Sequence, residues 1–318
     1  MKIEVVGCGR WGSFITWYLD LINLDVSLYG RSNSKNMIGF LTDRKNELLT
    51  LSEKVKLETS LDSLQDKDVI IISINSQGLQ DFFNEIKYLE LKNKIFVLCM
   101  KGIEITTLRR LSEIAKDNLD ISNKVAVWLG PGHVQEFVNH HPNCMVIDSE
   151  DENTTKFLVD TFSSDLIRFY YGNDLIGNEI GAAAKNVYGI AAGLLDGFSL
   201  TTLKGALMSR GTREIARLIK KMGGNELSAY GLCHLGDYEA TVFSKYSHNR
   251  AFGEAFAKHE PYTSLAEGYY TVKALKALGE KYDVELPICN AIYAILYENK
   301  DALEELKKLF TRSIKQEF

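Results

Sequence analysis

Paired cysteines, basic runs and long apolar stretches are all missing from this 318-residue chain. Its five cysteines are scattered and form no CxxC pair, which argues against a disulfide framework and against a zinc site. The net charge is −5 and basic residues do not cluster, so nucleic acid and anionic membranes are not expected partners. No uncharged apolar run approaches the roughly 20 residues of a membrane-spanning helix, so we expect no membrane insertion. We also expect no bound metal ion.

The start of the chain and its composition indicate where the protein works. The first residues, MKIEVVG, already have the pattern of a β-strand and leave no room for a signal peptide. Together with the unpaired cysteines this predicts a cytoplasmic protein, because free thiols persist in a reducing compartment. Hydrophobic residues make up 45% of the chain and charged residues 25%, proportions typical of a soluble globular protein. The length is sufficient for two domains.

A glycine-rich turn follows the first predicted strand. The first elements alternate around it in the order strand 2–6, turn GCGRWG at 7–12, helix 13–21 and strand 26–29. In this context GxGxxG indicates a dinucleotide-binding site. Gly7 makes the tight turn, Gly9 lets the backbone approach a pyrophosphate, and Gly12 lets the helix pack on the strand. The pyrophosphate is expected at the positive end of the helix.

The end of the second strand bears on the choice of cofactor. NAD-specific folds usually place a carboxylate there, whereas an arginine accommodates the 2′-phosphate of NADP. The chain has Tyr29-Gly30-Arg31-Ser32-Asn33, so Arg31 favours NADP or the use of both cofactors. A solvated surface arginine is the alternative.

Apolar runs continue the alternation through the first half of the chain. Long runs typical of parallel strands covered on both faces lie at 69–74, 95–100 and 125–129, helical patterns at 79–89 and 108–118, and shorter strands at 144–147 and 166–170. Ligands bind at the carboxyl ends of such strands. Lys101 follows one of these ends, where it either meets a substrate or is simply solvated.

After residue 177 the strands stop and helical patterns fill the rest of the chain. They lie at 180–195, 203–222, 271–282, 287–297 and 301–315. Polar, loop-like stretches lie at 236–241, 247–250 and 266–268, and each is expected to be a helix cap or a solvated loop. We therefore predict an α/β fold with an N-terminal, Rossmann-type, doubly wound sheet at 1–175 and a C-terminal all-helical domain at 176–318.

The helix predicted within 177–197 has two unusual features. Lys185 interrupts an apolar pattern, and Gly181, Gly189 and Gly193 lie on the same row of the helix. Each interior glycine costs about 1 kcal/mol relative to alanine, so a helix or a ligand is expected to approach this row closely. One interpretation is tight helix packing with Lys185 extending to water. The other is a partly desolvated lysine in a cleft, with a lowered pKa and a proton to exchange.

Taken in order, these motifs resemble the soluble NAD(P)-dependent glycerol-3-phosphate dehydrogenases over nearly the whole chain. The matching segments are GxGxWG at 7–12, KG at 101–102, GP at 130–131, GxExxGAxKNV at 177–187, DG at 196–197, SRG at 209–211, HLGD in place of GLGD at 234–237, SxNR at 247–250, EG at 267–268 and LP at 286–287. The combination of GAxKNV with the later GD and NR is highly specific.

The resemblance implies a Rossmann domain joined to a helical domain similar to the C-terminal domain of 6-phosphogluconate dehydrogenase, with the active site in the cleft between them. It implies reversible hydride transfer between NAD(P) and C2 of sn-glycerol 3-phosphate, giving dihydroxyacetone phosphate and serving phospholipid synthesis. It also implies a homodimer.

When the functional residues of the family are matched to this sequence position by position, the resemblance implies three groups of site residues. The implied catalytic residues are Lys185, Lys101, Asp237 and Thr241. The implied cofactor-binding residues are Gly7, Gly9, Arg10, Trp11, Gly12, Arg31, Lys101, Val134, His248, Leu265 and Glu267. The implied substrate-binding residues are Lys101, Gly130, Gly132, Lys185, Asn186, Asp237, Ser247, His248 and Asn249. These residue types suit ketone reduction, because a cation and a proton source both stabilise the charge that develops on the carbonyl oxygen.

The chain departs from the family pattern at two places. His248 replaces the arginine of SRNR that is expected to hold the substrate phosphate, and Gly132-His133 replaces a polar residue followed by an apolar one. Two alternatives therefore remain: a dehydrogenase of the same fold with another 2-keto or 2-hydroxy substrate, or a catalytically silent dinucleotide-binding regulator. The joint presence of Lys101, Lys185, Asp237 and Thr241 argues against the silent regulator, which would have no need for them.

Overall fold

The computed structural model describes residues 1–311 and 313, which divide into two compact units. The sheet unit comprises residues 1–101 and 109–175, and the helical unit comprises residues 102–108 together with the chain from Ile176 onward. The sequence alone places 102–108 in the first domain. In the structure Ile103 is fully buried in the hydrophobic core of the helical unit, which accounts for the different grouping of this segment.

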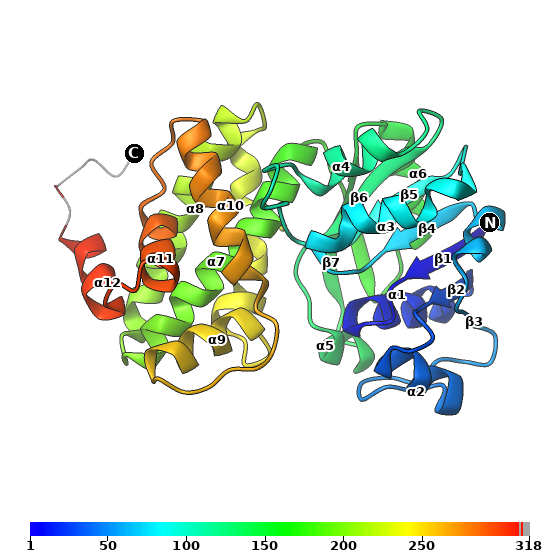
Figure 1. Ribbon diagram of the computed structural model, residues 1–318, viewed down its shortest axis with the longest axis horizontal. Helices are drawn as coiled ribbons and strands as arrows, with labels where there is room; N and C mark the ends of the chain where they lie inside the picture. The colour runs from blue at the N-terminus through cyan, green and yellow to red at the C-terminus, as the bar shows by residue number, and fades with distance from the viewer. Residues whose placement is uncertain (312, 314–318) are drawn as a thin grey trace. The chain divides into compact units, whose positions relative to one another are not determined.

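One mixed sheet forms the centre of the first unit (Figure 1). Among the described residues its strands are β1 Lys2–Val6, β2 Asp25–Tyr29, β3 Lys56–Glu58, β4 Val69–Ile72, β5 Ile95–Leu98, β6 Lys124–Leu129, β7 Asn143–Ser149 and β8 Ile167–Tyr171. Their order is β3-β2-β1-β4-β5-β6-β7-β8, and every neighbouring pair is parallel except β6 and β7. The strand order reverses beside β1, the position at which open α/β sheets bind their ligands. The predicted doubly wound fold is confirmed, with an antiparallel return at β7.

Helices cover both faces of this sheet. They are α1 Arg10–Leu21, α2 Lys35–Asp43, α3 Leu79–Ile86, α4 Leu111–Asn118, α5 Val134–Val138 and α6 Glu152–Phe162. Phe14 of α1 and Phe162 of α6 share a buried core with Trp128 of β6. Phe96 of β5 contacts Phe83 of α3, with ring centroids 6.2 Å apart. This two-sided burial explains why the strands have nearly continuous apolar runs.

Three α-helices and one strand of the sheet unit are missing from the sequence prediction: α2, α5, α6 and β3. Strand β3 has three residues and α5 has five, too few to show a period. The two longer helices carry a readable start signal, because the side chains of Ser34 and Asp151 accept backbone N–H groups as N-caps of α2 and α6. These caps could have identified both helices.

The second unit is helical and packs around α7 (Figure 1). Its described α-helices are α7 Leu175–Gly197, α8 Lys204–Lys221, α9 His248–Ala257, α10 Glu267–Lys281, α11 Pro287–Tyr297 and α12 Ala302–Phe310. Val187 and Ile190 of α7 are fully buried in one cluster with Val272 of α10 and Ile292 of α11. The apolar period of the sequence therefore predicts the centre of this unit correctly.

Three polar stretches that the sequence indicates as helix caps or solvated loops lie within helical turns or at helix starts. Residues 236–241 belong to a 3₁₀ turn, Leu235–Asp237, and a π-helical turn, Glu239–Phe243. Residues 247–250 are the N-cap and first turn of α9, and 266–268 begin α10. The helix-cap alternative is confirmed for Ser247, and the loop alternative is wrong for 236–241, because capping and first-turn positions are polar for the same reason that loops are. The last predicted helix, 301–315, ends at Phe310, and its residues 312, 314 and 315 lie outside the described part of the chain.

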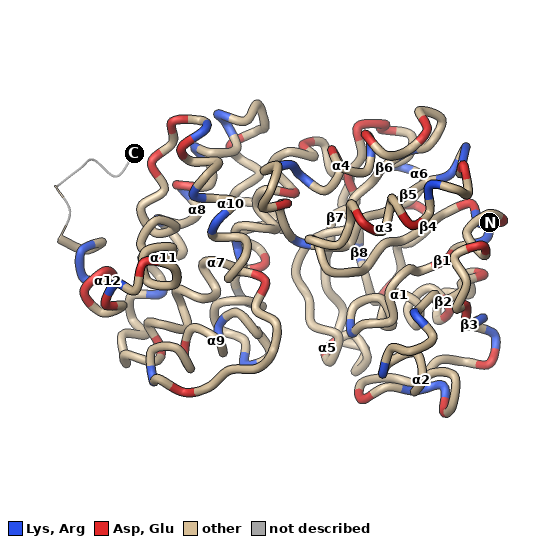
Figure 2. Tube along the Cα trace, viewed as in Figure 1, with Lys and Arg blue, Asp and Glu red and all other residues tan. Residues whose placement is uncertain are grey.

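Acidic and basic residues are interspersed along both units (Figure 2). In the described part of the chain, no helix combines the length and the apolar character needed to cross a membrane.

Candidate active site

The glycine turn after β1 provides the setting for a dinucleotide. Gly7 has a φ of +110°, and a Cβ there would lie 2.2 Å from the carbonyl oxygen of Ser73. A Cβ at Gly12 would lie 1.8 Å from the carbonyl oxygen of Gly7, so this position must be bare for α1 to sit against the turn. At Gly9, by contrast, an added Cβ would meet no described atom within 4 Å. Gly7 and Gly12 therefore shape the turn, whereas Gly9 leaves open space at the start of α1.

The residues that follow Gly9 bring α1 against α5. Trp11 lies near Phe14 and Phe137, with ring centroids 5.0 and 6.4 Å away, and Arg10 donates to Oε1 of Gln135 at 3.1 Å. Val134 is buried at the start of α5. The predicted cofactor residues Arg10, Trp11 and Val134 therefore cluster beside the glycine turn.

Lys101 lies at the carboxyl end of β5, next to the Gly130–His133 turn. Its Nζ donates to the carbonyl oxygen of Gly130 at 2.7 Å. Gly130 and Gly132 have φ values of +124° and +145°, and a Cβ at Gly132 would lie 2.3 Å from the Phe137 ring. The departure at Gly132 therefore has a conformational reason, because a side chain would be strained there. Lys101 therefore contacts Gly130, two residues before Gly132.

Arg31 has a partner that the sequence does not reveal. Its guanidinium lies 3.0 Å from Oε1 of Glu85, which α3 contributes. Both side chains are largely exposed, so the pair adds little to stability. No carboxylate occupies the end of β2 itself, but Glu85 supplies one beside Arg31. A 2′-phosphate would have to compete with this carboxylate for the arginine.

Lys185 of α7 forms a buried cluster with Asp237 and Thr241. Its Nζ lies 2.8 Å from Oδ2 of Asp237 and donates to Oγ1 of Thr241 at 2.8 Å. The three residues are between 0 and 8% exposed. The lysine therefore does not extend to water. The structure brings together three of the four implied catalytic residues, and all three belong to the helical unit.

The glycine row of α7 is filled by neighbouring side-chain and backbone atoms. A Cβ at Gly189 would lie 2.8 Å from Cγ2 of Thr241, and one at Gly193 would lie 2.0 Å from the carbonyl oxygen of Arg250. On the facing helix α9, a Cβ at Gly253 would lie 2.1 Å from the carbonyl oxygen of Ile190. The sequence predicts that either a helix or a ligand approaches this row closely, and the structure shows that helix α9 does so. This contact seats α9 and the π-helical turn beside Lys185.

Asn186 and Asn249 are joined next to this cluster. Nδ2 of Asn249 donates to Oδ1 of Asn186 at 3.0 Å, and Oδ1 of Asn249 accepts the backbone N–H of Gly268 at 2.9 Å. Glu267 precedes Gly268 at the start of α10. The two asparagines and the segment around Glu267 are thus fixed to one another.

The remaining predicted residues lie at the start of α9 and beyond it. The Ser247 hydroxyl accepts the backbone N–H of Arg250 as the N-cap of α9, which gives it a structural use. His248 is exposed, and its Nδ1 lies 3.0 Å from the hydroxyl of Tyr262, which also donates to the His248 carbonyl oxygen at 3.0 Å. Leu265 is 51% exposed.

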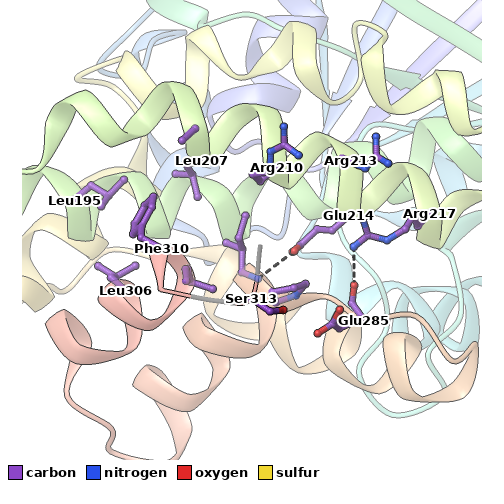
Figure 3. Close-up of a pocket in the computed structure, with 14 residues that line it drawn as sticks. Leu195, Leu207, Arg210, Arg213, Glu214, Arg217, Glu285, Leu306, Phe310 and Ser313 are labelled. Atoms are coloured by element: carbon purple, nitrogen blue, oxygen red, sulfur yellow. Dashed lines mark hydrogen bonds between the residues drawn. The ribbon is translucent and has the colours of Figure 1, made fainter. Parts of the chain in front are cut away.

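The helical unit also has a groove of about 650 Å³ formed by α8, α11 and α12 (Figure 3). Arg210, Arg213 and Arg217 of α8 line one part of it, and Leu306 and Phe310 of α12 line another. Its described lining includes none of the predicted site residues.

Glu214 of α8 also lines this groove and is almost fully buried. It accepts hydrogen bonds from the Tyr188 hydroxyl at 2.7 Å and from the backbone N–H groups of Ile288 and Cys289 at 3.0 and 3.1 Å. Burial raises the pKa of Glu214 to about 7, although these hydrogen bonds oppose the shift. Glu214 therefore acts as an N-cap of α11 from a different helix.

Sequence reasoning missed the side chains of Glu85, Tyr262 and Gln135, which contact the predicted site residues Arg31, His248 and Arg10. It also gave no role to His234, whose backbone carbonyl accepts the N–H of Asp237. Glu85 and Tyr262 lie on other elements than their partners, and nothing in their own spacing indicates the contact. His234 did carry a signal, because it stands where the GLGD pattern has a glycine.

A Rossmann-type sheet with this glycine turn, joined to a helical unit that holds a buried lysine–aspartate pair, defines a nicotinamide-dinucleotide-dependent oxidoreductase. Residues 2–155 match the model of the NAD-dependent glycerol-3-phosphate dehydrogenase N-terminus, and residues 174–307 match that of the C-terminus. The chain belongs to this NAD(P)-dependent glycerol-3-phosphate dehydrogenase family.

Individual relatives agree along the whole length. The chain is 31% identical over 328 residues to the glycerol-3-phosphate dehydrogenase (NAD(P)+) of Thermoanaerobacter sp. (strain X514), which covers 100% of this chain and 99% of the relative. It is also 31% identical over 331 residues to the enzyme of the same name from Fusobacterium nucleatum, covering 100% and 98%. The crystal structure of glycerol-3-phosphate dehydrogenase (gpsA) from Coxiella burnetii superposes with a TM-score of 0.91 at 26% identity, covering 98% of this chain and 99% of that one.

Proposed function

We propose that this protein catalyses reversible hydride transfer between sn-glycerol 3-phosphate and NAD(P)+, interconverting glycerol 3-phosphate and dihydroxyacetone phosphate. In the cell the reaction would supply glycerol 3-phosphate for phospholipid synthesis. The observation that carries the proposal is the buried contact of Lys185 with Asp237 and Thr241, within a chain that matches the family over nearly its full length.

Lys185 is the proposed proton donor. During reduction, hydride adds to C2 of the ketone, the electrons of the C=O π bond move to oxygen, and the ammonium of Lys185 passes a proton to that oxygen. In the reverse direction the neutral amine accepts the proton from the C2 hydroxyl. Asp237 holds the ammonium in place, and the Thr241 hydroxyl accepts a second hydrogen bond from Nζ, so that the orientation of the ammonium is fixed. Lys101 would add positive charge near the developing alkoxide.

The first unit has a setting that suits the dinucleotide, which supplies the hydride when bound. The open space at Gly9 beside the N-terminus of α1 fits a pyrophosphate, because backbone N–H groups and the helix dipole favour an anion there. We propose that Gly7, Gly9, Arg10, Trp11 and Gly12 bind it. Arg31, Val134, Lys101, His248, Leu265 and Glu267 complete the proposed set.

The proposed substrate residues follow the assignment that the family resemblance gives. Asn186 and Asn249 would hold the substrate hydroxyl groups, because each amide offers both a donor and an acceptor. His248 would stand in for the arginine that the family pattern has at this position. Gly130, Gly132, Lys101, Ser247, Lys185 and Asp237 complete the substrate set.

We further propose that the protein is a homodimer and works in the cytoplasm, both by analogy with the family. Sedimentation or light scattering of the purified protein checks the first proposal, and cell fractionation checks the second.

A single absorbance assay tests the proposed reaction. Oxidation of NADH and of NADPH is followed with dihydroxyacetone phosphate, with unphosphorylated dihydroxyacetone, with a panel of other 2-keto compounds, and with no carbonyl. We expect turnover with dihydroxyacetone phosphate well above that with every other compound. Preference for another ketone supports the altered-substrate alternative, and cofactor binding without turnover supports the silent regulator.

A further inference from the structure

His234 links the two elements that carry the Lys185–Asp237 pair, helix α7 and the Asp237 turn, and the proposed mechanism does not use it. It precedes the 3₁₀ turn that carries Asp237, and it is fully buried. Its backbone carbonyl accepts the N–H of Asp237 at 3.1 Å. Its ring Nδ1 lies 2.9 Å from the carbonyl oxygen of Gly181 on α7, and its Nε2 lies 3.0 Å from the hydroxyl of Tyr238.

The Gly181 carbonyl connects this ring directly to Lys185. In the unbroken helix α7 the i→i−4 pattern gives this oxygen the backbone N–H of Lys185. The imidazole of His234 and the backbone of Lys185 therefore meet at one oxygen atom. The contact is close, because a Cβ at Gly181 would lie 2.9 Å from the Cβ of His234. A side chain at Gly181 would push the ring away from α7.

The directions of both hydrogen bonds follow from the chemistry of the partners. Burial lowers the pKa of His234 to about 4, so the ring is neutral and carries one N–H near neutral pH. The carbonyl of Gly181 can only accept, which places the proton on Nδ1 and leaves Nε2 to accept from Tyr238. The charged groups that act on the ring are Lys185 of α7, which opposes protonation, and Asp237 of its own turn, which favours it.

Aromatic packing restricts the ring further. Tyr188 of α7 meets it edge-on with centroids 5.6 Å apart, and Tyr238 meets it in the same way at 4.8 Å. The ring is thus held by two aromatic neighbours and by hydrogen bonds at both nitrogens. A glycine, which the GLGD pattern has at this position, would provide none of these contacts.

We propose that His234 is a positioning residue that sets the register between α7 and the Asp237 turn, and so fixes the geometry of Lys185 against Asp237. This inference rests on the proposed function, in which that geometry governs proton transfer. The side chain acts through Gly181 and the turn, and it does not touch the substrate.

Two substitutions separate this role from simple filling of space. His234→Asn keeps an N–H donor close to the place of Nδ1, whereas His234→Gln moves its amide toward the place of Nε2 and loses the donor to Gly181. Tyr238→Phe is the matched control, because it removes the hydrogen bond at Nε2 and leaves the bond to Gly181. Melting curves establish that each variant is folded at the assay temperature.

Two readouts are measured on each variant. The first is kcat against pH with NADH and dihydroxyacetone phosphate. The second is the pH dependence of acetylation of Lys185 by acetic anhydride, followed by mass spectrometry, which requires no turnover. For folded His234→Gln we expect kcat to fall roughly tenfold to a hundredfold, with KM for NADH unchanged. We also expect the pH profile of Lys185 acetylation to shift. His234→Asn and Tyr238→Phe should stay within about threefold of wild type in kcat.

Several results would overturn the proposal. One is an unchanged acetylation profile in folded His234→Gln. Another is equal losses in the Asn and Gln variants, which would indicate a purely space-filling role. Failure of the proposed function looks different: wild type would then show no turnover, while the acetylation profiles of the variants would still decide the role of His234.

Discussion

Lys185 Nζ lies 2.8 Å from Oδ2 of Asp237, and the two side chains are 10% and 1% exposed. A buried pair of this kind resists the loss of either member, because removing one leaves an uncompensated charge at a cost of about 3–5 kcal/mol. Any substitution of Lys185 or Asp237 therefore affects both chemistry and folding. Kinetic measurements on this pair must be accompanied by a measurement of stability.

Alanine substitutions in the glycine turn should separate binding from folding. Gly12→Ala should lower the free energy of unfolding by about 1–3 kcal/mol, because its Cβ would clash with the Gly7 carbonyl. Gly9→Ala should fold normally and raise the dissociation constant for NADH by about tenfold, since its methyl group enters the space assigned to the pyrophosphate. Thermal melts and NADH fluorescence titration measure both effects. Normal cofactor affinity in Gly9→Ala would place the pyrophosphate elsewhere.

The choice of cofactor should depend on Arg31 and its partner. Arg31→Ala should raise KM for NADPH much more than KM for NADH, because only NADPH carries the 2′-phosphate. Glu85→Gln should lower KM for NADPH, since it removes the carboxylate that lies 3.0 Å from the guanidinium. Equal effects on the two cofactors would show that Arg31 is remote from the adenosine ribose.

Recognition of the substrate phosphate should improve when His248 is replaced by arginine. A guanidinium is always charged and presents a planar fork of donors that matches a phosphate, whereas an imidazole does not. In His248→Arg, KM for dihydroxyacetone phosphate should therefore be lower, by the equivalent of about 1–3 kcal/mol. Unphosphorylated dihydroxyacetone is the control. If the enzyme turns over unphosphorylated dihydroxyacetone as fast as the phosphate ester, the chain has no phosphate site. That result would support the alternative of a different substrate.

Stability should depend on pH through Glu214. Its folded-state pKa of about 7 lies above the ordinary value of 4.5, so the folded protein binds this proton more tightly than the unfolded chain does. This contribution is complete below the unfolded pKa and is lost as the pH rises through about 7. Its size is on the order of 3 kcal/mol. Wild type should therefore lose stability relative to Glu214→Gln between pH 4.5 and 7.5 in thermal melts. Parallel pH curves for the two proteins would mean that Glu214 is ionised throughout.

The sequence predicts well those elements whose signals are local and repeated. Strand β1, helix α11 and the glycine turn follow directly from apolar period, proline at a helix start and glycine spacing. Helix α9 was missed because Ser247 and His248 are polar, and only the structure distinguishes a cap from a loop. Residues 102–108 belong to the helical unit because of tertiary contacts, which no local sequence pattern predicts.

The candidate site divides in the same way. Lys185, Asp237 and Thr241 could be predicted together because the motifs that carry them resemble one family in sequence order. Their partners could not be predicted, because Glu85 and Tyr262 contact predicted residues across different elements. His234 lies within the GLGD-like motif, but the sequence does not indicate the contacts of its side chain. Only the structure shows the two hydrogen bonds of its ring.

The central claim is that Lys185 transfers the proton in a glycerol-3-phosphate dehydrogenase reaction. Lys185→Ala tests it most directly, with Lys204→Ala as the matched control. Lys204 is a similarly buried lysine of the helical unit, and its partner Asp196 keeps Arg250 when Lys204 is removed. With both variants shown to be folded, kcat for NADH and dihydroxyacetone phosphate is measured along with NADH affinity. We predict that Lys185→Ala loses roughly 10²–10⁴-fold in kcat while binding NADH normally, and that Lys204→Ala keeps most of its activity. A folded Lys185→Ala variant that retains more than about a tenth of wild-type kcat would contradict the account.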